Sequence, residues 1–283
     1  MTSSDMARRS PRPQLEPASA EPVDLRLHVA PGLDLPREAV TQTFAILAKR
    51  GAGKTHTASV MAEEMIGAGA RVVVLDPVGV WWGLRASADG GPGLPVYILG
   101  GNHADLALPA EAGGPIASLI AGGTGSFVLD VSLMSKTERR HFIADFAERL
   151  FRENQDPLHV MIDEADTFAP QRLEHGNERM FGAIDTMVRQ GRVRGIGVTL
   201  ISQRPAVVNK DVLTQTEVLL VLRITSPQDR KAIDDWIAFQ GTPERRAEIL
   251  GSLAGLPIGT AWAISPGWLD LCTKVSKRAR RPR

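Results

Sequence analysis

Short apolar runs alternate with amphipathic stretches along most of the chain. There are seven short β-rich runs, and several are nearly continuously apolar, which is typical of strands that are covered on both faces. These runs are residues 43–47, 71–76, 96–99, 126–131, 158–163, 197–202 and 218–224. Because helical patterns separate them, we expect right-handed crossover connections and an α/β fold with a mainly parallel sheet flanked by helices.

The helical signal is strongest in two amphipathic stretches. Residues 136–151 carry an apolar stripe, and Ser135 followed by Glu138 predicts a capping box at the start of this helix. Residues 178–194 carry a second stripe and end in an arginine-rich segment. Ligands of parallel sheets bind at the carboxyl ends of the strands, so candidate sites are expected at that edge.

The chain of 283 residues is predicted to form one domain with two tails. Residues 1–22 contain four prolines among Ser, Arg and Glu, a composition typical of a disordered leader. Residues 23–276 form the predicted domain, which ends in a strand pair at 259–264 and 269–275. Residues 277–283 are predicted to be a disordered basic tail.

The run at 43–47 leads into Ala48-Lys-Arg-Gly-Ala-Gly-Lys-Thr55, and a helix is predicted from there to about Gly67. A strand, a glycine-containing loop, Lys-Thr and a helix in this order are the context of a Walker A loop. Its backbone N–H groups and the positive end of the helix bind phosphate oxygens. Lys54 is expected to reach the β and γ phosphates, and the Thr55 hydroxyl to bind magnesium. The predicted nucleotide-binding residues are Lys49, Arg50, Gly51, Ala52, Gly53, Lys54, Thr55 and His56.

One position of this loop departs from the usual pattern. Ala48 stands where the Walker A loop normally begins with glycine. A methyl group is tolerated there as long as the backbone is not left-handed.

The run at 158–163 ends in two carboxylates, Asp163 and Glu164. An acid on a buried strand needs a partner, because an unpaired buried charge is costly. We expect Asp163 to hold magnesium through water, and Glu164 to orient or deprotonate the attacking water. The pair favours hydrolysis by an additional-strand ATPase.

The strand predicted at 197–202 is followed by Gln203, whose amide is expected to bond the γ-phosphate or the attacking water. Arg189 and Arg192 lie at the end of the preceding helix. They either complement the helix dipole in solvent, or one of them crosses a subunit interface as an arginine finger. The sequence does not distinguish the two arginines as fingers.

Taken together, these motifs resemble the HerA/FtsK group of P-loop DNA-translocating ATPases, and HerA most. The resemblance covers about residues 40–265 and is carried by Lys49–Thr55, Asp76-Pro77, Ile162-Asp163-Glu164-Ala165, Arg189-Gln-Gly-Arg192 and Ser202-Gln-Arg-Pro205. It implies a RecA-like core, ATP and Mg²⁺, a ring that is usually a hexamer, and double-stranded DNA in the central channel. The resemblance also points to a nuclease partner, because HerA proteins work with one.

HerA proteins usually carry an N-terminal β-barrel, for which the stretch before residue 40 is too short. We therefore expect a minimal ATPase module. The alternative function is an ATP-gated scaffold that hydrolyses slowly and recruits a separate nuclease or effector.

The formal net charge is only +1, but it is unevenly distributed. The last ten residues contain six Lys and Arg and no acid, so the rest of the chain is acidic. Such segregation is compatible with a nucleic-acid partner. The single cysteine, Cys272, excludes a disulfide framework and a cysteine-based zinc site. Because there is no signal peptide and no apolar run of about 18 residues, we expect a cytoplasmic protein without a membrane partner.

Trp81 and Trp82 are adjacent and cannot both face one core. Either one of them is exposed at a ring interface or channel, or the pair anchors a packed loop.

Overall fold

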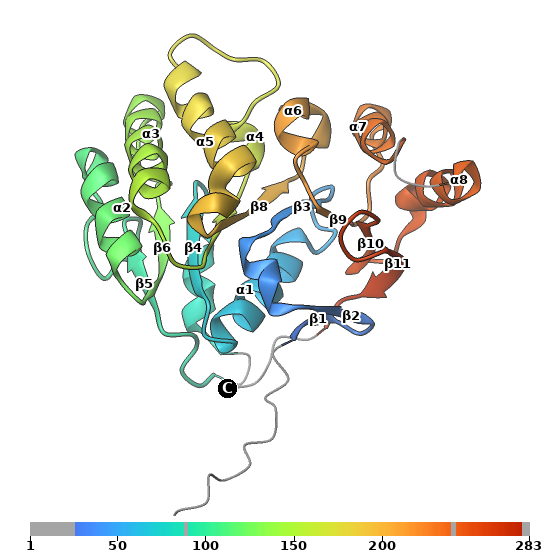
Figure 1. Ribbon diagram of the computed structural model, residues 1–283, viewed down its shortest axis with the longest axis horizontal. Helices are drawn as coiled ribbons and strands as arrows, with labels where there is room; N and C mark the ends of the chain where they lie inside the picture. Colours follow the sequence, from blue (N-terminus) through green and yellow to red (C-terminus); the bar gives the residue numbers. More distant parts are fainter. Residues whose placement is uncertain (1–25, 88–89, 239–241, 279–283) are drawn as a thin grey trace, which may run out of the picture.

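The computed structural model describes residues 26–87, 90–238 and 242–278. At its centre lies a nine-stranded sheet with the order β11-β10-β9-β3-β8-β7-β4-β6-β5 (Figure 1). The strands are β3 (Thr43–Leu47), β4 (Arg71–Asp76), β5 (Val96–Leu99), β6 (Ser126–Asp130), β7 (Leu158–Ile162), β8 (Ile196–Ser202), β9 (Val218–Val221), β10 (Thr260–Ser265) and β11 (Leu271–Ser276). Strands β3 to β9 pair in parallel, while β10 and β11 are antiparallel. The predicted α/β fold with a terminal strand pair is confirmed.

Strand β8 lies between β3 and β7 and pairs with both in parallel. Strand β8 thus separates β3, which leads to the glycine loop, from β7, which ends in the acids. Such an extra strand defines the additional-strand arrangement. All three strands run the same way, so the loop after β3, the acids after β7 and Gln203 after β8 meet at one edge.

The two faces of the sheet are covered by different elements, as Figure 1 shows. One face packs on α1 (Lys54–Gly67) and on a small hairpin of β1 (Leu27–Ala30) and β2 (Leu33–Leu35). The other face packs on the remaining helices. These are α2 (Gly113–Gly122), α3 (Lys136–Glu153), α4 (Ala165–Phe168), α5 (Glu178–Gln190), α6 (Lys210–Leu213), α7 (Pro227–Ile237) and α8 (Pro243–Ser252). Short 3-10 helices add η1 (Arg37–Thr41), η2 (Trp81–Arg85), η3 (Ala110–Ala112), η4 (Gly191–Arg194), η5 (Pro205–Val207) and η6 (Leu253–Gly255).

The alternation on β3 explains both cores. Phe44 and Ile46 point to the face with α1, while Ala45 and Leu47 point to the face with α3 and α5. Burial on both faces is the reason why the strands read as continuous apolar runs.

Some predicted boundaries differ from the structure. The predicted helix 178–194 ends at Gln190 and tightens into η4, where buried Gly191 packs against Ile196. The run 218–224 is a strand only to Val221. The capping box at α3 is confirmed, because the Ser135 hydroxyl accepts from the Glu138 backbone N–H and Glu138 accepts from that of Ser135.

The chain beyond residue 276 is part of the folded body for two more residues, where a disordered tail was expected. The Arg278 guanidinium donates to Glu64 Oε1 at 2.7 Å and to the His28 carbonyl at 2.8 Å. The predicted leader at 1–22 and the last residues of the predicted tail lie outside the described residues. Within the described ranges, no helix is both long and apolar enough to span a membrane.

A buried histidine fastens the sheet to η1. His159 on β7 is fully buried, with Nδ1 2.8 Å from the Val40 carbonyl and Nε2 2.6 Å from the Thr199 hydroxyl. A carbonyl oxygen only accepts, so Nδ1 carries the proton and Nε2 accepts from Thr199. Burial lowers the pKa of His159 to about 4, because the charged form loses its solvation.

This pKa makes the stability of the protein sensitive to acid. Between its ordinary pKa of 6.5 and about 4, the unfolded chain binds a proton that the folded chain does not. We expect the free energy of unfolding to fall by up to about 3 kcal/mol as the pH drops through this window. His159→Gln should show a shallower loss. Urea unfolding at neutral pH and at about pH 5 measures both slopes, and equal slopes would contradict the assignment.

Candidate nucleotide-binding and hydrolysis site

The loop between β3 and α1 has the backbone of a phosphate-binding turn. Gly51 and Gly53 have φ of 79° and 104°, in the region that favours glycine. A Cβ at Gly53 would also lie 3.4 Å from the backbone of Gly259. Among the described residues, only Glu164 and Asp270 are non-glycine residues with positive φ, so Ala48 fits its position.

The loop is fastened from both sides by backbone hydrogen bonds. Ala48 N donates to the Ser202 carbonyl at 3.2 Å, and Lys49 N donates to the Arg223 carbonyl at 2.9 Å. Gly259 N donates to the Ala52 carbonyl at 3.0 Å. The carboxyl ends of β8 and β9 and the start of β10 therefore fix the path of the loop.

Helix α1 begins at Lys54, directly after the loop, and no side chain caps its first turn. The N–H groups of that turn face an anion-binding position. The Thr55 side chain lies in the same turn. The His56 ring instead contacts the Arg278 carbonyl at 2.7 Å, so only its backbone belongs to the loop end of the helix.

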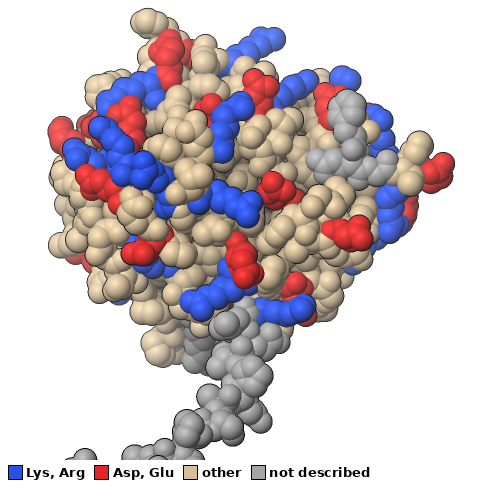
Figure 2. All heavy atoms as spheres, in the orientation of Figure 1, with Lys and Arg blue, Asp and Glu red and all other residues tan. Residues whose placement is uncertain are grey.

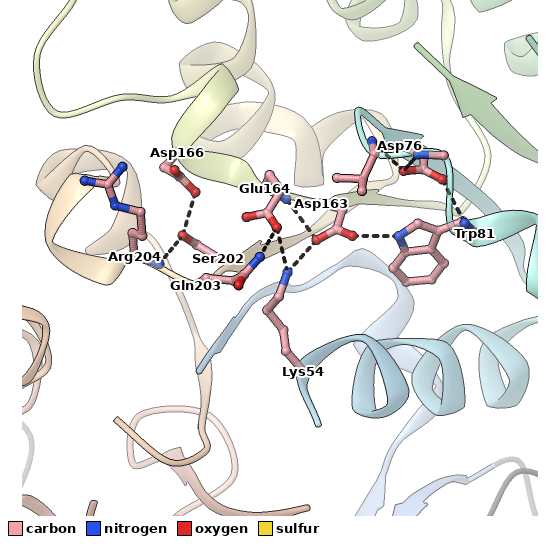
Figure 3. A network of polar contacts seen from close by, with 11 residues as sticks. Lys54, Asp76, Trp81, Asp163, Glu164, Asp166, Ser202, Gln203 and Arg204 are labelled. Carbon is pink, nitrogen blue, oxygen red and sulfur yellow. Dashed lines mark hydrogen bonds and ion pairs between the residues drawn. The ribbon is translucent and has the colours of Figure 1, made fainter. Parts of the chain in front are cut away.

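Lys54 reaches from α1 to the acids after β7, as Figure 3 shows. Its Nζ lies 2.7 Å from Asp163 Oδ1 and 3.6 Å from Glu164 Oε1. Lys54 is 7% exposed and Asp163 is 2% exposed, so the ion pair is buried. The structure thus brings Lys54 to two adjacent acids that lie more than a hundred positions further along the sequence.

Glu164 occupies an unusual backbone conformation. Its φ of 45° is left-handed, which costs free energy for a residue with a Cβ and points to a constrained site. Its carboxylate accepts a hydrogen bond from the Gln203 amide, and its backbone N–H donates to Asp163 Oδ1 at 2.9 Å. The predicted base and the predicted sensor are therefore in direct contact.

Asp76 and Trp81 join this site from β4 and the loop that follows it. The buried Asp76 carboxylate accepts backbone N–H groups from Val78, Gly79, Val80 and Trp81. Burial raises the pKa of Asp76, and the bonds from Trp81, Val78 and Gly79 oppose the rise. The Trp81 indole N–H then donates to Asp163 Oδ2 at 2.8 Å (Figure 3).

The role of Trp81 was not predicted from the sequence. Trp81 is 2% exposed and packs as a loop anchor, while Trp82 is 41% exposed and stacks on His103. Nothing in the spacing of the adjacent pair indicates that the indole reaches an acid 82 residues away.

The predicted arginines lie at the opposite edge of the sheet. They immediately precede β8, whose seven residues separate them from the site by roughly 20 Å. Arg189 is held by Asp185 at 2.6 Å. Within the described part of the chain, Arg192 forms no ion pair. Neither arginine reaches the site of its own subunit.

The residues present fit a magnesium ion that is bound mainly by a nucleotide. Among the described residues, no cluster of three or more His, Cys, Asp or Glu side chains forms a metal site of its own. Magnesium in such sites keeps waters and substrate phosphates as ligands and needs one or two protein oxygens. Asp163 Oδ2 accepts a single hydrogen bond, from Trp81, and retains a lone pair for a metal-bound water. The Thr55 hydroxyl is the other candidate ligand.

Comparison with known sequences gives a match in the first part of the domain. Residues 28–90 match the family model "Helicase HerA, central domain". The DNA double-strand break repair helicase HerA of Pyrococcus furiosus is 34% identical over 105 residues. A probable HerA of Methanocaldococcus jannaschii is 33% identical over 105 residues. The match to the Pyrococcus protein spans 37% of this chain but only 18% of that relative, so the chain corresponds to a small part of it.

Comparison with solved structures extends over most of the chain. The bacterial conjugative coupling protein TrwB aligns with a TM-score of 0.64 at 12% identity, and the alignment covers 89% of each chain. The genome packaging NTPase B204 of Sulfolobus turreted icosahedral virus 2 has a TM-score of 0.60 at 12% identity. The alignment with B204 covers 85% of this chain and 98% of B204. These likenesses show the fold.

The sheet order, the glycine loop and the acids after β7 define the class: the chain has the fold of a P-loop NTPase with a RecA-like core. Within this class, the predicted resemblance to the HerA/FtsK group is confirmed, with the match to HerA lying at residues 28–90.

The contact between Trp81 and Asp163 gives a test of the site. Trp81→Phe keeps the packing but removes one hydrogen bond to a charged acceptor, a bond worth about 1.5–3 kcal/mol. We expect ATP turnover to fall roughly tenfold or more. Trp82→Phe is the matched control, because Trp82 is exposed and does not touch the acids. Equal turnover of both variants would show that the indole does not position Asp163.

Proposed function

We propose that the protein hydrolyses ATP with magnesium and couples this reaction to translocation or remodelling of double-stranded DNA, as a ring-shaped oligomer, most simply a homohexamer. The observation that carries the proposal is the contact of Lys54, Asp163, Glu164 and Gln203 beside the glycine loop. Phosphate binding, metal binding and activation of water are thereby assigned to three neighbouring strands.

Lys54 is the residue that responds first to the nucleotide. Its ammonium group is neutralised by Asp163 at 2.7 Å in this structure. A triphosphate at the loop offers it more negative charge, so Lys54 transfers its contact from Asp163 to the β and γ phosphates. Asp163 would then be free to hold a water on a magnesium ion. Magnesium, when bound, neutralises the developing negative charge of the phosphates.

Glu164 is proposed as the base that takes the proton of the attacking water. Its carboxylate is shared by Lys54 and Gln203. Once Lys54 turns to phosphate, Glu164 retains one strong donor, and its second oxygen remains available to accept the water proton. Gln203 is left to orient Glu164 and the γ-phosphate together.

Glu164→Gln tests the base. The amide preserves the shape and the contact with Gln203 but accepts no proton, so we expect ATP to bind with unchanged affinity and turnover to fall about 10²–10⁴-fold. Glu217→Gln is the control, since Glu217 is exposed and precedes β9 at the amino edge. Turnover of the Glu164 variant equal to that of the control would remove Glu164 from the mechanism.

Double-stranded DNA is proposed as the partner for two reasons. The HerA relatives are named as DNA double-strand break repair helicases, and basic residues are concentrated at the end of the chain. Figure 2 shows acidic and basic side chains interspersed on the visible face, so the body offers no single-sign field there. On this face, attraction for DNA must come from local clusters. A nuclease or effector partner and a cytoplasmic location remain predictions from the resemblance and the composition.

Ala48, a departure from the usual Walker A pattern, was one of the reasons for the scaffold alternative. Ala48 lies in an ordinary backbone conformation and is buried without strain. The loop therefore gives no reason to expect slow hydrolysis, and we favour the motor.

Arg192 is proposed as the arginine finger of a neighbouring subunit. Asp185 already holds Arg189, whereas Arg192 is exposed on η4 and forms no ion pair within the described residues. Its place at the amino edge of β8 excludes a role in its own site. A head-to-tail ring would bring this edge to the carboxyl edge of the next subunit.

Mixing of inactive variants tests this role. Arg192→Ala should lower turnover roughly a thousandfold, and Lys54→Ala should abolish it. A mixture of the two should recover turnover, because interfaces with Lys54 from one subunit and Arg192 from the other are complete. Arg189→Ala should retain most of its activity. Failure of the mixture to exceed the sum of its parts would contradict a finger in trans.

A further inference from the structure

A second hollow lies beside the site and is lined by Asp166 and Arg204. Figure 3 shows these two residues on the side of Ser202 away from Lys54. This cavity has a volume of about 470 Å³. The first turn of α3, the segment that follows α4 and the loop after β8 line it. The five cations of its lining are Lys136, Arg139, Arg140, Arg172 and Arg204.

The positive charge of this cavity is largely uncompensated. Its two acids are Asp166 and Glu174. Glu174 pairs with Arg140 at 3.0 Å, and Asp166 accepts from the Ser202 hydroxyl at 2.8 Å. The other four cations of the lining form no ion pair within the described residues.

Two polar atoms of the lining are buried without any partner in the described structure. Arg139 is half-buried, and its Nε has no acceptor. Burial lowers the pKa of Arg139, and no neighbouring carboxylate offsets that effect. Asn177 is 6% exposed, and its Oδ1 has no donor. Unpartnered buried groups cost free energy, so a ligand that satisfies them is bound favourably.

We propose that this cavity binds the phosphate backbone of double-stranded DNA, and that this binding is coupled to ATP hydrolysis at the neighbouring site. The inference rests on the proposed function. Guanidinium groups match phosphate oxygens in geometry and charge. The cations come from three separate segments and converge on one hollow, which suits a polyanion that is held at successive phosphates.

The connection to the hydrolytic site runs through the tip of β8. The Arg204 backbone N–H donates to Ser202 Oγ at 3.0 Å, and Ser202 Oγ donates to Asp166 Oδ1 at 2.8 Å. Gln203, between Ser202 and Arg204, holds the Glu164 carboxylate. A phosphate drawn in by Arg204 therefore acts on the segment that carries Gln203, the residue that contacts the base.

Binding of a fluorescent DNA duplex to the full chain, followed by anisotropy over a range of salt concentrations, tests the proposal. The variants are Arg139→Gln and a double variant, Lys136→Gln with Arg172→Gln, which changes exposed side chains only. Arg152→Gln is the matched control, because Arg152 lies on the same helix, α3, is exposed and pairs with Glu148 outside the cavity. Thermal melting checks that each variant is folded.

We expect the double variant to bind the duplex roughly tenfold more weakly and to lose about 0.9 per removed phosphate contact from the slope of log affinity against log salt. Its stimulation of ATP turnover by DNA should fall in parallel, while Arg152→Gln should match the wild type. Inorganic phosphate at equal ionic strength should not replace the duplex as the stimulator; if it does, the site takes free phosphate and the proposal is wrong.

Equal binding and slope for the wild type and the double variant would overturn the cavity as the DNA site. If the wild type then still hydrolyses ATP and binds DNA, only this inference fails. If the wild type neither hydrolyses ATP nor binds DNA, the proposed function fails with it.

Discussion

The buried ion pair between Lys54 and Asp163 is the interaction on which the rest of the site depends. Removing both charges from water is costly, and their attraction offsets that cost only with good geometry and further hydrogen bonds. The structure supplies these bonds to Asp163 from the Glu164 backbone and the Trp81 indole. The pair therefore joins the glycine loop, β7 and the loop after β4.

Much of the fold could be predicted because strands covered on both faces leave continuous apolar runs in the sequence. The seven predicted runs all became strands of the sheet. The β1–β2 hairpin was missed because its strands have four and three residues, too few for their alternation to stand out in the sequence. Helices α7 and α8 were also missed, since their apolar faces are short and broken by charged residues.

The candidate site divides in the same way. Lys54, Asp163, Glu164 and Gln203 were predicted because each follows a strand in a local motif. Trp81 could not be predicted, since its contact depends on the position of β4 beside β7. The cavity at Arg204 joins three distant segments and has no local signature either. The choice between Arg189 and Arg192 likewise needed the position of Asp185, one helical turn before Arg189.

The contacts of Arg278 have a mechanical consequence. One guanidinium holds the carbonyl of His28 near the start of the folded body and Glu64 on α1, while the Arg278 carbonyl holds His56. Both ends of the body are thus fastened to the helix that begins with Lys54. A load applied to either terminal segment would be borne by α1 and transmitted along its axis to the phosphate loop. Tension on the terminal segments and nucleotide binding at the loop would therefore be mechanically coupled through α1.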